Sequence, residues 1–231
     1  MFFDCAKGTF YNNLFVVAVS TGMRIGELAA LRWSDIDWKT NVIKVTRTLV
    51  YQKYEDDEQK SFHFENPKTA TSKRNIPINH QCEMALKRQY MQKNVIAQKA
   101  PKSKSVDKQY ADLLFTTKFD TPINSQIICE AIKKVVDEIE VFSPHCFRHT
   151  FETRCFEACI QPKTVQAYLG HASLQMTMDL YTSVMPKHMS NEMDKVSEVL
   201  DRLSTNGDTI TEDSYNKAVQ NNKIISFYGD S

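Results

Sequence analysis

The sequence has little in it that would place the protein in a membrane or outside the cell. None of its 231 residues belongs to an apolar stretch approaching the roughly 18 residues that a membrane-spanning helix needs. The first residues, MFFDCAKGTF, lack the basic and then apolar layout of a secretion signal. We therefore expect a cytoplasmic protein with no membrane partner.

The sequence also lacks the paired cysteines of common zinc motifs. Its six cysteines include no C-x-x-C pair, so in the cytosol they are expected to be free thiols that act as small apolar side chains. Cys155 and Cys159 are spaced to share one face of a helix, near His145 and His149, which leaves a zinc hydrolase as an alternative. That alternative predicts bound metal and sensitivity to chelators.

A strong net charge is absent too, because the formal net charge is +1. The charge is nevertheless polarised along the chain. Residues 60–108 contain eleven Lys/Arg and three Asp/Glu, whereas residues 190–231 contain four Lys/Arg and eight Asp/Glu. A basic segment of this kind suits a phosphate backbone, although a solvated surface without a ligand fits the same counts.

The pattern of apolar residues favours an α+β protein that is mainly helical. Helical spacing predicts helices over residues 10–20, 24–32, 79–98, 126–140, 146–159, 162–169, 174–183 and 187–203. β-Branched and alternating residues predict strands over 41–50, around Phe62 and Phe64, and over 73–78, where Pro77 suits only a sheet edge. The residues expected at helix ends are Asn79, Asn124 or Ser125, Pro162 and Gly170. A small antiparallel sheet and a hairpin, with its tip at Glu55–Glu58, should therefore lie within a helical chain.

A set of residues scattered along the chain suits phosphoryl transfer: Arg24, Lys68, His145, Arg148, His171 and Tyr181. Cleavage of a phosphodiester places extra negative charge on the non-bridging oxygens, and two arginines can hold both oxygens with forked hydrogen bonds. Arg24 follows Gly22 at the start of a helix, and Arg148 shares a helical face with His145. Each arginine alone is an ordinary surface residue, so the hypothesis depends on the whole set.

Tyrosine can accept the phosphoryl group, but its ordinary pKa of about 10 keeps the phenol protonated. Two guanidinium groups would favour the phenolate of Tyr181, and His145 is the better candidate for the base that takes its proton. His171 suits a hydrogen bond to a non-bridging oxygen, and Lys68 can give a proton to the leaving 5′ oxygen. Further phosphate contacts, non-specific and salt-dependent, are expected from Lys73 and Arg74.

These residues stand in motifs that resemble the tyrosine recombinase (phage integrase) family, and the likeness is strongest to integrases of conjugative transposons and Gram-positive phages. TGMRIGEL (21–28) holds Arg24 and a supporting acid, Glu27. The other motifs are NPKTATSKR (66–74), HCFRHT (145–150), YLGHAS (168–173) and LYTSV (180–184). Tyr181 follows His171 by ten residues, which is the spacing that the family prefers. The likeness covers roughly residues 5–200.

The resemblance implies a site-specific recombinase that integrates and excises a mobile element. Tyr181 would attack a DNA phosphate to form a 3′-phosphotyrosine, and a 5′ hydroxyl of a partner strand would resolve it without ATP, metal or another cofactor. The implied partners are double-stranded DNA, as recombination sites and Holliday junctions, and further copies of the chain in a homotetramer on DNA. An excisionase-type accessory protein is also implied, and a monomer is expected without DNA.

The same resemblance divides the chain into a catalytic domain over 1–204 and a polar tail over 205–231. The domain ends in a helix at about 187–203 that docks on the adjacent protomer, and the family's N-terminal DNA-binding domain or domains are expected to be absent. Residues 51–66 exceed a minimal hairpin, so we expect an extra β-hairpin that contacts DNA or a neighbouring subunit. The alternatives are a type IB-like topoisomerase, which shares the chemistry without sequence preference, and a DNA-binding regulator, which would have lost Tyr181 or an arginine.

Overall fold

The computed structural model describes residues 2–66, 72–99, 107–136, 142–184, 197, 198, 200 and 201. The chain forms two compact units, Met1–Val184 and Met185–Ser231, and the features below belong to the first. Lys68, the tail over 205–231 and most of the helix predicted over 187–203 lie outside the described residues. The predictions for these parts, and for a boundary at 204, therefore stay predictions.

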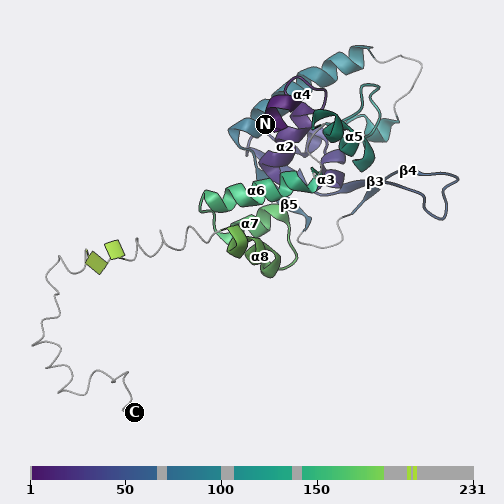
Figure 1. Cartoon of the computed structure of the whole chain (residues 1–231). Helices are drawn as coiled ribbons and strands as arrows, with labels where there is room; N and C mark the ends of the chain where they lie inside the picture. The colour runs from purple at the N-terminus through teal and green to yellow at the C-terminus, as the bar shows by residue number, and fades with distance from the viewer. Residues whose placement is uncertain are drawn as a thin grey trace, which may run out of the picture. The chain divides into compact units, whose positions relative to one another are not determined.

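The first unit is mainly helical and also contains short antiparallel strands (Figure 1). The helices are α1 (Phe2–Ala6), α2 (Asn12–Thr21), α3 (Ile25–Ala29), α4 (His80–Lys99), α5 (Ser125–Val135), α6 (His145–Glu157), α7 (Pro162–Leu169) and α8 (Leu174–Val184), with 3₁₀ turns at Trp33–Asp35 and Lys108–Tyr110. The strands are β1 (Ile36–Asp37), β2 (Val42–Val45), β3 (Thr48–Gln52), β4 (Ser61–Glu65) and β5 (Arg74–Pro77). Across the described ranges, no helix is both long and apolar enough to cross a membrane.

Several helices begin and end at the residues that the sequence predicted. The side chains of Asn79 and Asn124 each accept a hydrogen bond of 2.9 Å from a backbone N–H in the first turn of their helices. Pro162 occupies the first turn of α7, and Gly170 ends that helix in the left-handed conformation with φ of 66°. These assignments are confirmed because each depends on neighbours within a few residues.

The strand predicted over 41–50 is two strands that belong to different sheets. β2 lies between β1 and β5 in a three-stranded antiparallel sheet, and β3 pairs with β4 in a separate hairpin. Between them the chain turns at Arg47, whose Nη1 lies 2.6 Å from Oδ2 of Asp35. The sheet order leaves β5 at an edge, as Pro77 requires. The predicted hairpin is confirmed, and Figure 1 shows it projecting away from the helices.

The hydrophobic core holds α2 against α4 and α6. The rings of Phe15 on α2 and Phe147 on α6 stack with their centroids 5.4 Å apart, and both side chains are fully buried. The apolar segment Leu113–Phe115 also enters the core, where the N–H of Leu114 bonds the carbonyl of Leu31 at 2.8 Å. This packing fixes the C-terminal end of α2, from which the chain runs directly into α3.

Candidate functional site

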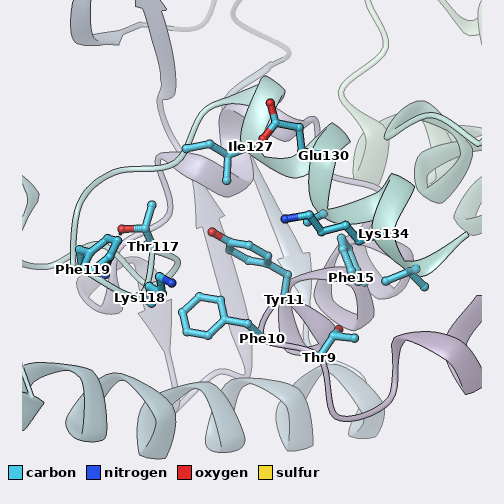
Figure 2. Close-up of a pocket in the computed structure, with 12 residues that line it drawn as sticks. Thr9, Phe10, Tyr11, Phe15, Thr117, Lys118, Phe119, Ile127, Glu130 and Lys134 are labelled. Carbon is cyan, nitrogen blue, oxygen red and sulfur yellow. Dashed lines mark hydrogen bonds between the residues drawn. The ribbon is translucent and has the colours of Figure 1, made fainter. Parts of the chain in front are cut away.

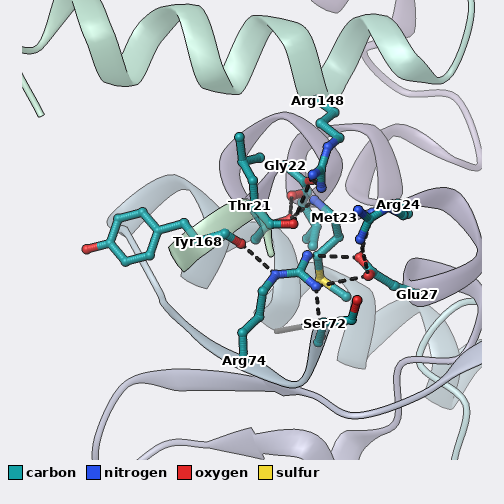
Figure 3. A network of polar contacts seen from close by, with 11 residues as sticks. Thr21, Gly22, Met23, Arg24, Glu27, Ser72, Arg74, Arg148 and Tyr168 are labelled. Carbon is teal, nitrogen blue, oxygen red and sulfur yellow. Dashed lines mark hydrogen bonds and ion pairs between the residues drawn. The ribbon is translucent and has the colours of Figure 1, made fainter. Parts of the chain in front are cut away.

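Glu27 lies at the centre of a buried network of charges, which Figure 3 shows from close by. It stands in the first turn of α3, where its carboxylate accepts a bond of 2.8 Å from the backbone N–H of Arg24. The same carboxylate bonds Nη1 of Arg24 at 3.1 Å and holds the guanidinium of Arg74 with two bonds of 2.9 Å. Burial opposes ionisation, but the bonds and charge of Arg74, and then of Arg24, bring the pKa of Glu27 below its ordinary value.

The position of Arg74 differs from the DNA contact that the sequence predicted for it. Its side chain is 4% exposed, and Nε donates to the backbone carbonyl of Tyr168 at 2.6 Å while Nη1 also reaches that of Ser72 at 3.3 Å. All three nitrogens of the guanidinium are thus bonded, so Arg74 is placed to tie β5 to α3 and α7 rather than to hold a phosphate. Lys73, the preceding residue, is exposed, and its contact with a phosphate stays a prediction.

The side chain of Arg24 is bonded to Glu27 on one side and exposed to solvent on the other. Its side chain is 41% exposed while it bonds the buried Glu27. Arg24 also lines a cavity of about 570 Å³ that lies between the start of α3, the β3–β4 hairpin and the chain from Gly170 to Met176. The guanidinium therefore has a fixed orientation and a space in front of it that can receive a ligand.

Replacing Glu27 with alanine is expected to destabilise the fold by about 3–5 kcal/mol, because it leaves the buried Arg74 without a counter-charge. The free energy of unfolding in urea measures this loss. A double variant, Glu27→Leu with Arg74→Met, should recover most of it, since neither partner then stays buried and unpaired. The contribution of Glu27 is present above the ordinary carboxyl pKa and disappears as the pH falls through its lower folded value.

The matched control is Glu83→Ala on the exposed face of α4, where Glu83 pairs with Lys87 at 2.6 Å. Exposed pairs of this kind contribute less than about 1 kcal/mol. If Glu27→Ala lowers the free energy of unfolding no more than Glu83→Ala does, the buried network has no structural role.

Arg148 joins three elements of the fold from its place on α6. Its side chain is buried, Nη1 donates to the carbonyl of Gly22 at 2.8 Å, and Nη2 donates to the carbonyl of Leu169 at 2.9 Å. Burial, followed by the positive charges of Arg24 and Arg74, lowers the pKa of Arg148 to about 10. The group is still protonated at neutral pH, and its fork is fixed against the ends of α2 and α7.

Gly22 has a conformation and a position that no other residue can take easily. Its φ is +62°, and a Cβ there would lie 2.6 Å from carbons of both Leu169 and Phe151. Gly22→Ala should therefore destabilise the fold by roughly 2–4 kcal/mol, from the left-handed backbone and from overpacking. Gly8→Ala is the control, because Gly8 has φ of +83° but open space around its Cβ position. Urea titrations of both variants measure the difference, and equal losses would contradict the packing argument.

His171 follows the end of α7 and is buried against two side chains. Its Nδ1 lies 2.9 Å from Oγ1 of Thr177 on α8 and 3.9 Å from Oε1 of Glu152 on α6. Burial, followed by the charges of Arg148, Arg24 and Arg74, lowers the pKa of His171 to about 4. The imidazole is thus neutral at neutral pH, with Nδ1 held by the protein.

Tyr181 and His145 lie on the helices that carry the other groups. Tyr181 is one turn after Thr177 on α8, and its half-buried ring meets the ring of Phe156 edge-on at 5.1 Å. His145 is the first residue of α6, exposed and one turn before Arg148. α6 and α8 pack against each other, and the contact of Tyr181 with Phe156 lies near the C-terminal end of α6, eight residues after Arg148 and eleven after His145.

The alternative of a zinc site has no support in the arrangement of side chains. Throughout the described part of the chain, no cluster of three or more His, Cys, Asp or Glu side chains is placed to hold a metal ion. Cys155 is buried on α6, while Cys159 lies beyond the end of that helix with φ of 57° and is exposed. The two cysteines therefore do not continue one helical face, as their spacing had suggested.

A second cavity, of about 490 Å³, shares no residue with the first. It lies between the start of α2, the turn at Thr117–Phe119 and α5, and Figure 2 shows Phe10 and Tyr11 between these elements. Burial raises the pKa of Tyr11 above its ordinary value, so its phenol stays protonated. This cavity gathers no set of reactive groups, and we assign it no role in the site.

The sequence identified most of the residues in the network but missed two of them. Arg24, Glu27, Arg148 and His171 were predicted, whereas Glu152 and Thr177 were not. Glu152 stands four residues after Arg148, so helical spacing could have placed it on the same face of α6. Thr177 gave no such signal, because its role depends on how α8 returns towards His171.

Comparisons with known proteins identify the family of the chain. A model of the phage integrase family matches residues 4–188. The chain belongs to the phage integrase family. A tyrosine recombinase XerC-like protein of Caldanaerobacter subterraneus is 30% identical over 85% of this chain and 51% of its own length. The transposase of transposon Tn916 from Enterococcus faecalis is 25% identical over 85% of this chain and 48% of its own length.

Solved structures of phage integrase family members share the fold. A Tn1549 transposon integrase in complex with circular intermediate DNA has a TM-score of 0.68 and 24% identity, over 84% of this chain and 64% of that one. The XerA recombinase has a TM-score of 0.56 and 23% identity, over 83% and 60%. The predicted fold class, a tyrosine recombinase catalytic fold, is thereby confirmed. The chain spans about half the length of the curated relatives it matches.

Proposed function

We propose that this domain is the catalytic part of a site-specific DNA recombinase, which cuts and rejoins strands through a 3′-phosphotyrosine on Tyr181. The observation that carries the proposal is the convergence of Arg24, Arg148 and His171 on one network. Arg148 bonds the carbonyl of Gly22, two residues before Arg24, and the carbonyl of Leu169, two residues before His171. Tyr181 stands one turn from the threonine that bonds His171.

The two arginines are suited to the non-bridging oxygens of a DNA phosphate. A guanidinium has five N–H donors, and Arg148 uses one on Gly22 and one on Leu169, which fixes its plane and leaves the others for a ligand. Arg24 is fixed by Glu27 and lines the open cavity. A clamp of this kind stabilises the negative charge that develops in the transition state.

The remaining roles follow the chemistry of the reaction. Tyr181 attacks the phosphorus, His145 takes the phenol proton, His171 bonds a non-bridging oxygen, and Lys68 protonates the leaving 5′ oxygen. The phosphotyrosine preserves the phosphodiester energy for the rejoining step, so the cycle balances without a nucleotide or a metal. Glu27 supports the reaction indirectly, because it orients Arg24.

Double-stranded DNA is the proposed partner, because the related Tn1549 integrase was solved in complex with circular intermediate DNA and the XerH recombinase was solved bound to its difH substrate. Two buried bases of the basic segment, Arg74 and Lys93, pair with Glu27 and Asp120, so they add little to a phosphate-facing surface. Exposed bases such as Lys73 supply that surface, and the β3–β4 hairpin is proposed to contact DNA or a neighbouring subunit.

A homotetramer on two duplexes is proposed because an exchange between duplexes cuts four strands, and each cut occupies one Tyr181. The chain alone is expected to be a monomer, with the segment at 187–203 linking neighbours on DNA and an excisionase-type protein setting direction. Light scattering with and without a synthetic Holliday junction tests the change of state. A single mass under both conditions would contradict it.

The decisive experiment traps the covalent intermediate. Duplex oligonucleotides of randomised sequence, nicked so that cleavage releases a short fragment, are mixed with the chain at low salt, where phosphate contacts are strongest. An adduct that resists denaturation is isolated, the modified peptide is identified by mass spectrometry, and the attached DNA is sequenced. We expect phosphate on Tyr181 and an enriched DNA sequence. Adducts without sequence enrichment would favour a topoisomerase, and no adduct under any condition would contradict the proposed function.

A further inference from the structure

Glu152 is a buried carboxyl group that the proposed reaction does not use. Its residue is 3% exposed, and its Oε1 has no hydrogen-bond partner in the described structure. Burial raises the pKa of Glu152 to about 7, although the charge of Arg148 acts in the opposite direction. A carboxyl in such a place is costly to the fold, so its position beside the network calls for a role.

The group that Glu152 faces is His171. Oε1 lies 3.9 Å from Nδ1 of His171, the same nitrogen that bonds Thr177 at 2.9 Å. Both of these contacts are made by Nδ1, so Glu152 and Thr177 act on one side of the ring. The second ring nitrogen, Nε2, is the one that the proposed function assigns to the DNA phosphate.

The charges around this pair come from several elements. Burial lowers the pKa of His171 first, followed by the charges of Arg148 and His149 of α6, Arg24 at the start of α3 and Arg74 of β5, so the ring is neutral near pH 7. Cys155 lies one turn after Glu152 on α6, and burial followed by the charge of Glu152 raises the pKa of Cys155 to about 11. Cys155 thus stays protonated, and Glu152 is the member of the pair that titrates near neutrality.

A neutral imidazole has a single N–H, and its neighbours decide which nitrogen carries it. When Glu152 is protonated, the Thr177 hydroxyl can donate to Nδ1, and the ring hydrogen then stands on Nε2. When Glu152 is ionised, its negative charge draws the hydrogen to Nδ1. Nε2 then presents a lone pair, which repels the oxygen of a phosphate.

We propose that Glu152 is a positioning residue that acts through His171, because the charge on its carboxyl decides whether Nε2 faces the DNA phosphate as a hydrogen-bond donor. The inference rests on the proposed function of His171 in binding that phosphate. It goes further in giving the site a built-in sensitivity to pH. The donor form is present when the carboxyl is protonated, and it is lost as the pH rises through about 7.

The test compares Glu152→Gln with the wild-type chain, since an amide cannot ionise and has nearly the same shape. The initial rate of adduct formation on the nicked duplex pool is measured from about pH 6 to about pH 9. The wild-type rate should fall about tenfold for each pH unit above the carboxyl pKa, and the Gln variant should lack this loss. Every other ionisable group of the site is common to both proteins, so its effect on the rate cancels in the comparison.

Two further variants separate positioning from packing. Glu152→Ala should be slower at every pH, because the cavity loosens His171, and it too should lack the alkaline loss. Glu157→Gln, on the exposed end of the same helix, should follow the wild-type profile. If Glu152→Gln also follows the wild-type profile, the inference is wrong.

A second readout does not depend on DNA cleavage. Ring ¹⁵N shifts of histidine-labelled protein, with His171 assigned from the spectrum of His171→Asn, report which nitrogen carries the hydrogen. We expect a change from Nε2–H to Nδ1–H in the wild-type chain as the pH rises, and Nε2–H throughout in Glu152→Gln. The same tautomer in both proteins at all pH values overturns the inference. A wild-type chain that shows the tautomer change but forms no adduct contradicts the proposed function alone.

Discussion

Tyr181→Phe should form no covalent adduct with nicked DNA, while DNA binding and the free energy of unfolding stay close to those of the wild-type chain. The variant removes one oxygen, which is the atom that attacks phosphorus in the proposed reaction. The ring is kept, so its edge-on contact with Phe156 at 5.1 Å is preserved. Denaturing gels measure the adduct, and fluorescence anisotropy measures the binding of the same duplexes.

Tyr168→Phe is the matched control for this variant. Tyr168 lies on α7, and its backbone carbonyl accepts a hydrogen bond from Nε of Arg74, but Figure 3 shows its ring directed away from the arginines. Its hydroxyl should therefore be dispensable, and adduct formation should match the wild-type level. If the adduct persists in Tyr181→Phe and disappears in Tyr168→Phe, the nucleophile is Tyr168 and the proposal for Tyr181 is wrong.

Arg148→Lys should slow adduct formation by roughly 10²–10³-fold, the usual effect of removing one fixed donor from a developing negative charge. Lysine keeps the charge but lacks the planar fork, so it cannot bond the carbonyls of Gly22 and Leu169 in the same geometry and also meet a phosphate. One buried carbonyl left without its donor should also cost about 1–3 kcal/mol of stability. Single-turnover rates and urea titrations measure the two effects separately.

Arg154→Lys, on the same helix, is the control that shows whether the slower adduct formation is specific to Arg148. Arg154 is exposed and pairs with Glu157 at 2.6 Å, so the change should alter neither rate nor stability. A loss of less than about tenfold in Arg148→Lys, with the fold intact, would show that the guanidinium fork is not needed for the reaction.

Local signals in the sequence were sufficient for most of the secondary structure. The asparagine caps, Pro162 and Gly170 act on backbone groups a few residues away. Their effects can therefore be predicted without the rest of the fold. The strand predicted over 41–50 failed at Thr46 and Arg47, where the chain leaves one sheet for another. At this break Arg47 bonds Asp35, twelve residues earlier, and the β-branched run does not reveal that contact.

Charged residues were harder to interpret from the sequence than apolar ones. Arg74 was grouped with Lys73 as a phosphate contact because both stand in a basic segment. The structure separates them, since Arg74 bonds Glu27, 47 residues earlier, and Lys73 points to solvent. A count of charges along the chain cannot distinguish a base that faces DNA from one that is buried with an acid.

The motifs alone were sufficient to predict the family and the fold class, because each motif is short and its residues are neighbours on the chain. They also single out Arg24, Arg148, His171 and Tyr181, whose catalytic roles stay predictions. The tertiary structure decided what those residues bond. Glu27 with Arg74, Arg148 with the ends of α2 and α7, and His171 with Thr177 and Glu152 are contacts between different elements. Such contacts depend on how helices cross and where turns return, and burial then sets the pKa of each group.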